Sequence, residues 1–108
     1  MAVKEIMLVC AAGMSTSLLV TKMQQAAEAE NLAVHIVAVP VPEATVYLQQ
    51  ESVDVLLLGP QVRYMLAEFE STLAEKGIPV AVIPMTDYGM MRGDKVLALA
   101  KSLMESPK

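Results

Sequence analysis

The sequence has few of the residues on which several common kinds of site depend. It contains one cysteine, one histidine, one phenylalanine and no tryptophan, and aromatic residues make up 4% of its 108 positions. A single cysteine excludes an internal disulfide, and together with a single histidine it excludes a conventional zinc site. So few aromatic rings offer no platform for stacking nucleic-acid bases. We therefore expect no metal site and no cofactor.

Positive charge is also scarce, and it is scattered along the chain. Eight lysines and arginines face twelve aspartates and glutamates, which gives a formal net charge of -4. A protein that binds nucleic acid neutralises phosphates with a cluster or stripe of basic side chains. We therefore expect no nucleic-acid partner.

Long hydrophobic runs are missing, although hydrophobic residues make up 55% of the chain. No stretch approaches the roughly 18 to 20 apolar residues of a membrane-spanning helix. The apolar run at 6–14 follows an acidic Glu5 and places the bulky Val9 before Cys10, which argues against a lipoprotein signal. We expect a cytoplasmic protein, without direct membrane insertion, whose lone thiol suits a reducing compartment.

The chain does have the length and apolar content for one compact core, so we expect a single domain over residues 1–108. Runs typical of buried strands alternate with amphipathic helical patterns. The expected strands are 3–10, 33–39, 53–58 and 78–83, and the expected helices are 15–30, 42–50, one from about 60 that stops at Gly77, and a last one capped by Asp94 after a turn over 84–94. This alternation predicts a small doubly wound α/β fold, with a four-stranded parallel sheet and helices on both faces.

Ligands of such sheets bind at the carboxyl ends of the strands, and Cys10 ends the first one. Small and hydroxyl-bearing residues follow it, so consecutive backbone N–H groups can converge on one point. Gly13 permits a positive φ, and the helix that begins near Ser15 adds the positive end of its dipole. These donors favour a thiolate and hold an anion, which makes the segment an anion cradle around a sulfur.

Four interpretations of this segment stay open on the residues alone. Cys10 is a small buried hydrophobe, a passive anion module, a carrier of a phosphoryl group, or the nucleophile of a phosphatase of the low-molecular-weight tyrosine type. Those phosphatases share the predicted fold and place an arginine after five residues that follow the cysteine, where this chain has Thr16. Without that guanidinium, which promotes hydrolysis, a carrier fits better, although Asp87 is a candidate general acid.

The segments CAAGMSTSLLV at 10–20 and VLLLGPQVRYM at 55–65 resemble the B component of the bacterial phosphoenolpyruvate-dependent sugar phosphotransferase system, in its lactose/cellobiose branch. The resemblance covers nearly the whole chain. It implies that Cys10 is a catalytic residue, which accepts a phosphoryl group from a phosphohistidine of the A component and passes it to a sugar bound by the membrane-embedded C component. The phosphate-binding residues that it implies are Ala11, Ala12, Gly13, Met14, Ser15, Thr16 and Ser17.

The resemblance also bears on the substrate, because the Gly-Met-Ser-Thr form of the loop is closer to the cellobiose side of the branch. The expected sugar is a β-linked disaccharide such as cellobiose or chitobiose. Possible accessory residues follow the third and fourth strands, at the end of the sheet where Cys10 is expected, namely Gln61, Tyr64 and Tyr88.

Several other residues have plainer interpretations. His35 falls early in the second strand, away from Cys10, so we expect an ordinary strand histidine. Arg63 is either the nearest basic group to the site or a solvated charge. Asp87 would repel a phosphocysteine unless its side chain points away. Loop methionines are either gap fillers or a pliable rim for docking two partners in turn, namely Met14, Met85, Met90 and Met91.

Overall fold

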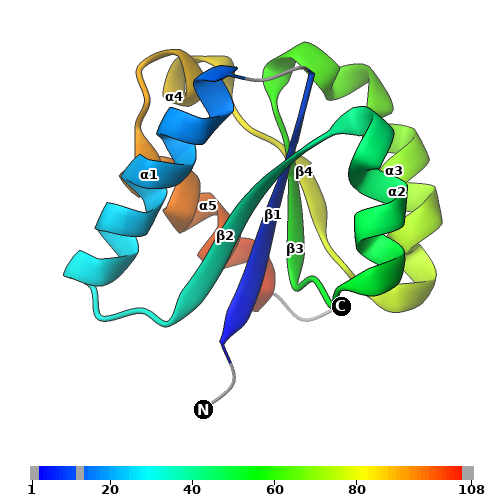
Figure 1. Cartoon of the computed structure of the whole chain (residues 1–108), viewed down its shortest axis with the longest axis horizontal. Helices are drawn as coiled ribbons and strands as arrows, with labels where there is room; N and C mark the ends of the chain where they lie inside the picture. Colours follow the sequence, from blue (N-terminus) through cyan, green and yellow to red (C-terminus); the bar gives the residue numbers. More distant parts are fainter. Residues whose placement is uncertain (1–2, 12–13, 106–108) are drawn as a thin grey trace.

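A four-stranded parallel sheet forms the centre of the computed structural model, which describes residues 3–11 and 14–105 (Figure 1). The strand order is β2-β1-β3-β4, and every neighbouring pair is parallel. The strands are β1 (Lys4–Cys10), β2 (Val34–Pro40), β3 (Val55–Leu58) and β4 (Val80–Val82). Each lies inside or within one residue of a predicted strand.

Helices cover both faces of this sheet. Figure 1 shows α1, α4 and α5 on one face and α2 and α3 on the other. Their bounds are α1 (Met14–Ala29), α2 (Val41–Gln50), α3 (Leu66–Leu73), α4 (Met85–Gly89) and α5 (Gly93–Glu105), with 3-10 turns η1 (Pro60–Met65) and η2 (Ala74–Lys76) flanking α3. The predicted doubly wound α/β class is confirmed.

Alternation along β1 divides the core in two. Ile6 and Leu8 pack with α1 and α5, whereas Met7 and Val9 pack with α2 and α3, and all four are fully buried. Successive side chains of a strand point to opposite faces, so Cys10 belongs to the face that α1 covers. Burial on both sides explains why β1 reads as an unbroken apolar run.

The predicted helix after β3 is broken into three pieces. Val62 has φ -118° and ψ 25°, outside the helical range, and separates the start of η1 from α3. The apolar positions nevertheless face the core, since Val62, Phe69 and Leu73 are at most 6% exposed and Met65 and Leu66 are half-buried against them. The periodicity therefore predicted which side chains face the core. It did not predict that the backbone carrying them is broken into several short helical pieces. Gly77 does end this region, with a positive φ of 69°.

The predicted turn over 84–94 contains a helix that periodicity did not indicate. α4 is only five residues long, too short to display a repeat, and it begins after Pro84. Asp94 is not the cap of the last helix, because α5 already begins at Gly93. Its carboxylate lies in the first turn instead, where hydrogen bonds from Arg92 hold the pKa of Asp94 below its usual value.

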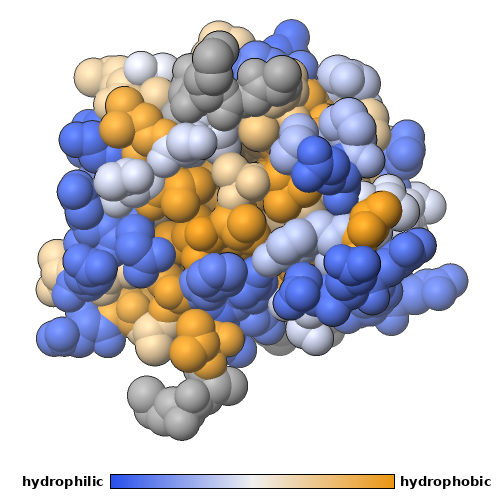
Figure 2. Space-filling view, in the orientation of Figure 1, coloured by the Kyte–Doolittle hydropathy of each residue, from blue (hydrophilic) through white to orange (hydrophobic). Residues whose placement is uncertain are grey.

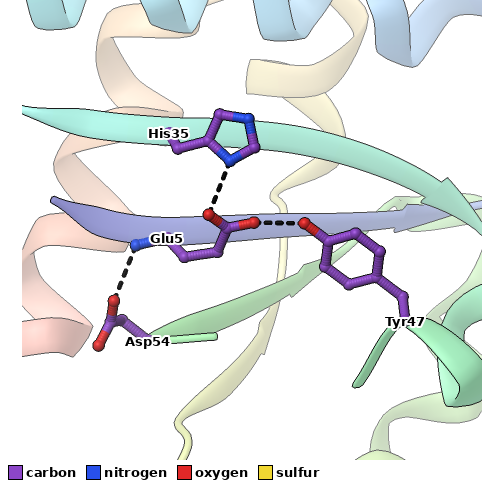
Figure 3. Close-up of polar contacts among 4 residues, drawn as sticks. All are labelled: Glu5, His35, Tyr47 and Asp54. Carbon is purple, nitrogen blue, oxygen red and sulfur yellow. Dashed lines mark hydrogen bonds and ion pairs between the residues drawn. The ribbon is translucent and has the colours of Figure 1, made fainter. Parts of the chain in front are cut away.

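A polar cluster joins three elements at the amino end of β1 (Figure 3). The Glu5 carboxylate accepts hydrogen bonds from Tyr47 of α2 and from His35 Nδ1, which is 2.7 Å away. The Glu5 backbone N–H donates to Asp54 Oδ2 at 2.7 Å. The His35 side chain is 63% exposed and lies opposite Glu5 in the β1–β2 register, so its interpretation as a strand histidine is confirmed.

The outer strand β2 carries much of the apolar surface on the face seen in Figure 2, where hydrophobic residues gather across the middle of the view. A groove of about 450 Å³ beside it is lined by Val37, Ala38, Val39, Pro42, Glu43, Val46, Tyr47 and Gln50. Within 3–11 and 14–105, no helix has both the length and the apolar content needed to cross a membrane.

Close contact between α1 and α5 gives the first prediction. A Cβ atom at Gly93 would lie 2.5 Å from the backbone carbonyl carbon of Lys22 and 2.6 Å from the nitrogen of Met23. Because backbone atoms cannot yield as side-chain ends do, Gly93→Ala should lower the free energy of unfolding by about 2 to 3 kcal/mol in urea titrations. Gly89→Ala, where a Cβ meets nothing within 4 Å, is the control. Equal stability of the two variants would contradict this packing.

The Glu5 cluster gives a prediction about pH. Burial, and then the hydrogen bond to the Glu5 carboxylate, raise the pKa of Tyr47. A raised folded-state pKa means that this hydrogen bond stabilises the fold fully below about pH 10 and progressively less above it. The stability advantage of the wild type over Tyr47→Phe should therefore stay constant up to about pH 9 and shrink above about pH 10. Urea midpoints measure it, and a constant difference would refute the assignment.

Candidate functional site

The single thiol lies at the carboxyl end of β1. Cys10 pairs in register with Pro40 of β2 and is 4% exposed. Its Sγ donates a weak hydrogen bond to the carbonyl oxygen of Val39, 3.9 Å away. The neighbouring strands thus fix the sulfur at the edge of the sheet where ligands of parallel α/β proteins bind.

The start of α1 lies at this same end of the sheet (Figure 1). Ala11 is exposed, Ala12 and Gly13 lie outside the described residues, and the backbone of Met14 and Ser15 opens α1. Its first turn contains no acidic residue, so no carboxylate there offsets the helix dipole. The first N–H groups of a helix have no partner within it, which makes this helix end a source of donors for an anion.

A buried hydrogen bond ties α1 to α4. Thr16 Oγ1 and Tyr88 Oη lie 2.9 Å apart, from residues that are 1% and 8% exposed. Thr16 is the position at which the phosphatase loop would carry its arginine. At this sequence position the chain therefore has a neutral, hydrogen-bonded hydroxyl group in place of a positive charge.

The Tyr88 ring also lies close to Gly59, which follows β3. The Gly59 N–H donates to the Val9 carbonyl oxygen at 2.9 Å. A Cβ atom on Gly59 would lie 3.2 Å from Gln61 Oε1 and 3.7 Å from Tyr88 Cε2. Gln61 and Tyr88 therefore both lie close to Gly59, whose N–H is bonded to the residue that precedes Cys10.

A cavity of about 320 Å³ lies beside this pair, lined by Pro60, Gln61, Arg63, Met85, Tyr88 and Gly89. Arg63 is exposed on its rim, and its Nη1 donates to the Pro60 carbonyl oxygen at 3.3 Å. Tyr64 is 74% exposed and does not line the cavity. Pro60 and Gly89 are lining residues that sequence reasoning missed.

Asp87 and three of the loop methionines lie on or near α4. Asp87 is half-buried, and its backbone carbonyl accepts the Arg92 N–H at 2.9 Å. Met85 and Met90 are 65% and 64% exposed, whereas Met91 is half-buried against the α1 side of the core. Only part of the predicted methionine rim is therefore open to solvent.

The chemistry open to this site follows from its donors. Within the described ranges, no group of three or more His, Cys, Asp or Glu side chains could hold a metal ion. A sulfur at the same sheet edge as a helix N-terminus, whose first turn contains the buried Thr16 hydroxyl, suits the binding of a covalently attached anion. The fold and site define a class of small α/β proteins with a parallel sheet whose first strand ends in a cysteine.

Comparison with known sequences narrows this class to one family. The sequence model of the PTS system lactose/cellobiose specific IIB subunits matches residues 5–99. The chain belongs to this family, and it is accordingly a phosphotransferase component of a bacterial sugar phosphotransferase system. Components of this kind work together with A and C components.

Three curated relatives align over nearly their full lengths. The galactose-specific EIIB component of Lactococcus lactis subsp. cremoris and the cellobiose-specific EIIB component of Lactococcus lactis subsp. lactis are each 51% identical over 107 residues, covering 96% of this chain and 99% of the relative. The oligo-beta-mannoside-specific EIIB component of Bacillus subtilis is 40% identical over 101 residues, covering 94% of this chain and 96% of that protein.

Two solved structures share the fold. The lactose-specific IIB component domain from Streptococcus pneumoniae superposes with a TM-score of 0.82 at 16% identity, covering 94% of this chain and 97% of that one. The cellobiose-specific IIB component from Borrelia burgdorferi gives 0.76 at 38% identity, covering 95% and 93%.

Proposed function

We propose that this chain is a phosphocarrier whose Cys10 accepts a phosphoryl group from a phosphohistidine of the A component and transfers it to a sugar held by the C component. The observation that carries the proposal is the position of Cys10. It ends a strand whose last five residues are buried, at the same sheet edge as the N-terminus of α1. Thr16, whose hydroxyl pairs with that of Tyr88, stands at the sequence position where a phosphatase has its arginine.

The first step is a displacement at phosphorus. The Cys10 thiolate attacks the phosphoryl group of the phosphohistidine, the S–P bond forms and the P–N bond breaks. The imidazole leaves with the electron pair and takes up a proton. Backbone N–H groups of residues 11–17 and the dipole of α1 stabilise the thiolate before the step and the phosphoryl oxygens after it.

The second step runs from the phosphocysteine to the sugar. A sugar hydroxyl oxygen attacks phosphorus, the O–P bond forms and the S–P bond breaks. Cys10 leaves as a thiolate, which the same donors stabilise, and the hydroxyl proton passes to water. The cavity beside Gln61 and Tyr88 is next to the end of β1 and leaves room for an approaching group.

The phosphoryl group stays on Cys10 between these steps because Thr16 stands at the position where a phosphatase has its arginine. A guanidinium stabilises the charge that develops as water attacks a phosphoryl group, and such stabilisation is worth several powers of ten in rate. Thr16 is buried and its described partner is the neutral Tyr88 hydroxyl. The site thus binds the anion while accelerating hydrolysis little.

For the sugar, we propose a β-linked disaccharide such as cellobiose or chitobiose. Relatives of equal 51% identity carry the descriptions galactose-specific and cellobiose-specific. Sequence identity in this component therefore does not distinguish between sugars. This supports a B component that makes few contacts with the sugar. The C component then selects the substrate, and this chain works beside it as a single cytoplasmic domain without a cofactor.

Incubation of the full chain with a phosphorylated A component tests the proposal. The wild type should gain one phosphoryl group on Cys10, and Cys10→Ser should gain none, because a serine hydroxyl is not ionised near neutral pH. Mass spectrometry locates the label, and addition of the C component with sugar should discharge it.

The alternatives give different results in the same assay. Steady release of phosphate from an aryl phosphate by the wild type, lost in Cys10→Ser, would identify a cysteine-dependent phosphatase instead. A wild type that is never labelled, while Cys10→Ser still binds inorganic phosphate normally, would identify a passive anion-binding module.

A further inference from the structure

Within the proposed phosphocarrier function, we infer that Tyr88 is a positioning residue that aims the hydroxyl hydrogen of Thr16 at the phosphoryl group on Cys10. The observation is the buried 2.9 Å hydrogen bond between the two hydroxyls, which joins α1 and α4 across 72 positions of sequence. This inference rests on the proposed function and assigns a role in it to a pair of side chains.

The hydrogens of the Thr16 and Tyr88 hydroxyl groups determine what Thr16 can donate to. Each hydroxyl group has one hydrogen to donate, and their shared bond uses only one of the two. The phenol is the more acidic group and hence the better donor. When Tyr88 donates to Thr16 Oγ1, the hydrogen of Thr16 stays free for another acceptor.

The position of Thr16 determines which acceptor its hydroxyl hydrogen can reach. Thr16 lies in the first turn of α1, at the carboxyl end of β1, and is 1% exposed. No described residue accepts from its hydroxyl apart from Tyr88. A phosphoryl group bound at the same helix end supplies strong acceptor oxygens, and a hydrogen bond to a charged acceptor is stronger than a neutral one.

The Tyr88 ring is itself held in place by packing. Its ring packs in the α1-side core and is 8% exposed. The ring edge also lies close to Gly59, where a Cβ would be only 3.7 Å from Cε2. Because α4 and the end of β3 fix the ring, its hydroxyl has a fixed place from which to orient Thr16.

The equilibrium of phosphoryl exchange between the A component and this chain tests the inference. Thr16→Val should lower the ratio of phosphorylated chain to phosphorylated A component about tenfold. Tyr88→Phe should lower it about fivefold, and the double variant should match Thr16→Val alone within about twofold, because the two hydroxyls act in series. Thr16→Ser, which keeps the hydroxyl, should stay within about twofold of the wild type.

Tyr47→Phe is the matched control, because it removes a hydrogen-bonded tyrosine hydroxyl at the opposite end of the sheet. It should lower stability in urea and leave the exchange ratio unchanged. Additive effects of Thr16→Val and Tyr88→Phe would overturn the inference in favour of separate roles, as would a Tyr88→Phe ratio equal to that of the wild type. A wild type that is never labelled on Cys10 would overturn the proposed function, and this inference with it.

Discussion

Burial of β1 on both faces is the constraint on which the rest of the structure depends. Its four central side chains are fully buried, and they alternate between the α1–α5 and the α2–α3 halves of the core. Neither half can shift along the strand without exposing apolar surface. Cys10, the last residue of β1, therefore has a fixed position relative to the helix that follows it.

This rigidity shapes the chemistry expected of the site. Donors that are already in place at a helix N-terminus need no rearrangement when an anion arrives. Whether the phosphoryl group is retained or hydrolysed then depends on the charges close to the phosphocysteine. Thr16, at the sequence position where the phosphatases have an arginine, instead makes a buried, neutral hydrogen bond with Tyr88.

Much of the fold was predictable because strand and helix patterns report burial directly. β1 and α1 lie within one residue of their predicted bounds, and the exposed His35 was correctly separated from the site. The break at Val62 escaped prediction, since a buried position has the same periodicity whether or not its backbone is helical.

The candidate site was predictable in its centre and not at its margins. Cys10 could be placed from strand order alone, because a parallel sheet gathers the carboxyl ends of its strands at one edge. The Thr16–Tyr88 bond could not, because α4 is too short to show a period and its partner lies 72 positions away. Local patterns contain no information on such a distant pair.

A phosphoryl group on Cys10 should be held by the segment that joins β1 to α1. Amide proton–nitrogen NMR spectra of the full chain, recorded before and after phosphorylation by the A component, test it most directly. The largest changes should fall on the amide signals of residues 11–17, while those of His35 and Tyr47 at the other end of the sheet stay in place. Largest changes at that other end, or none near Cys10, would contradict it.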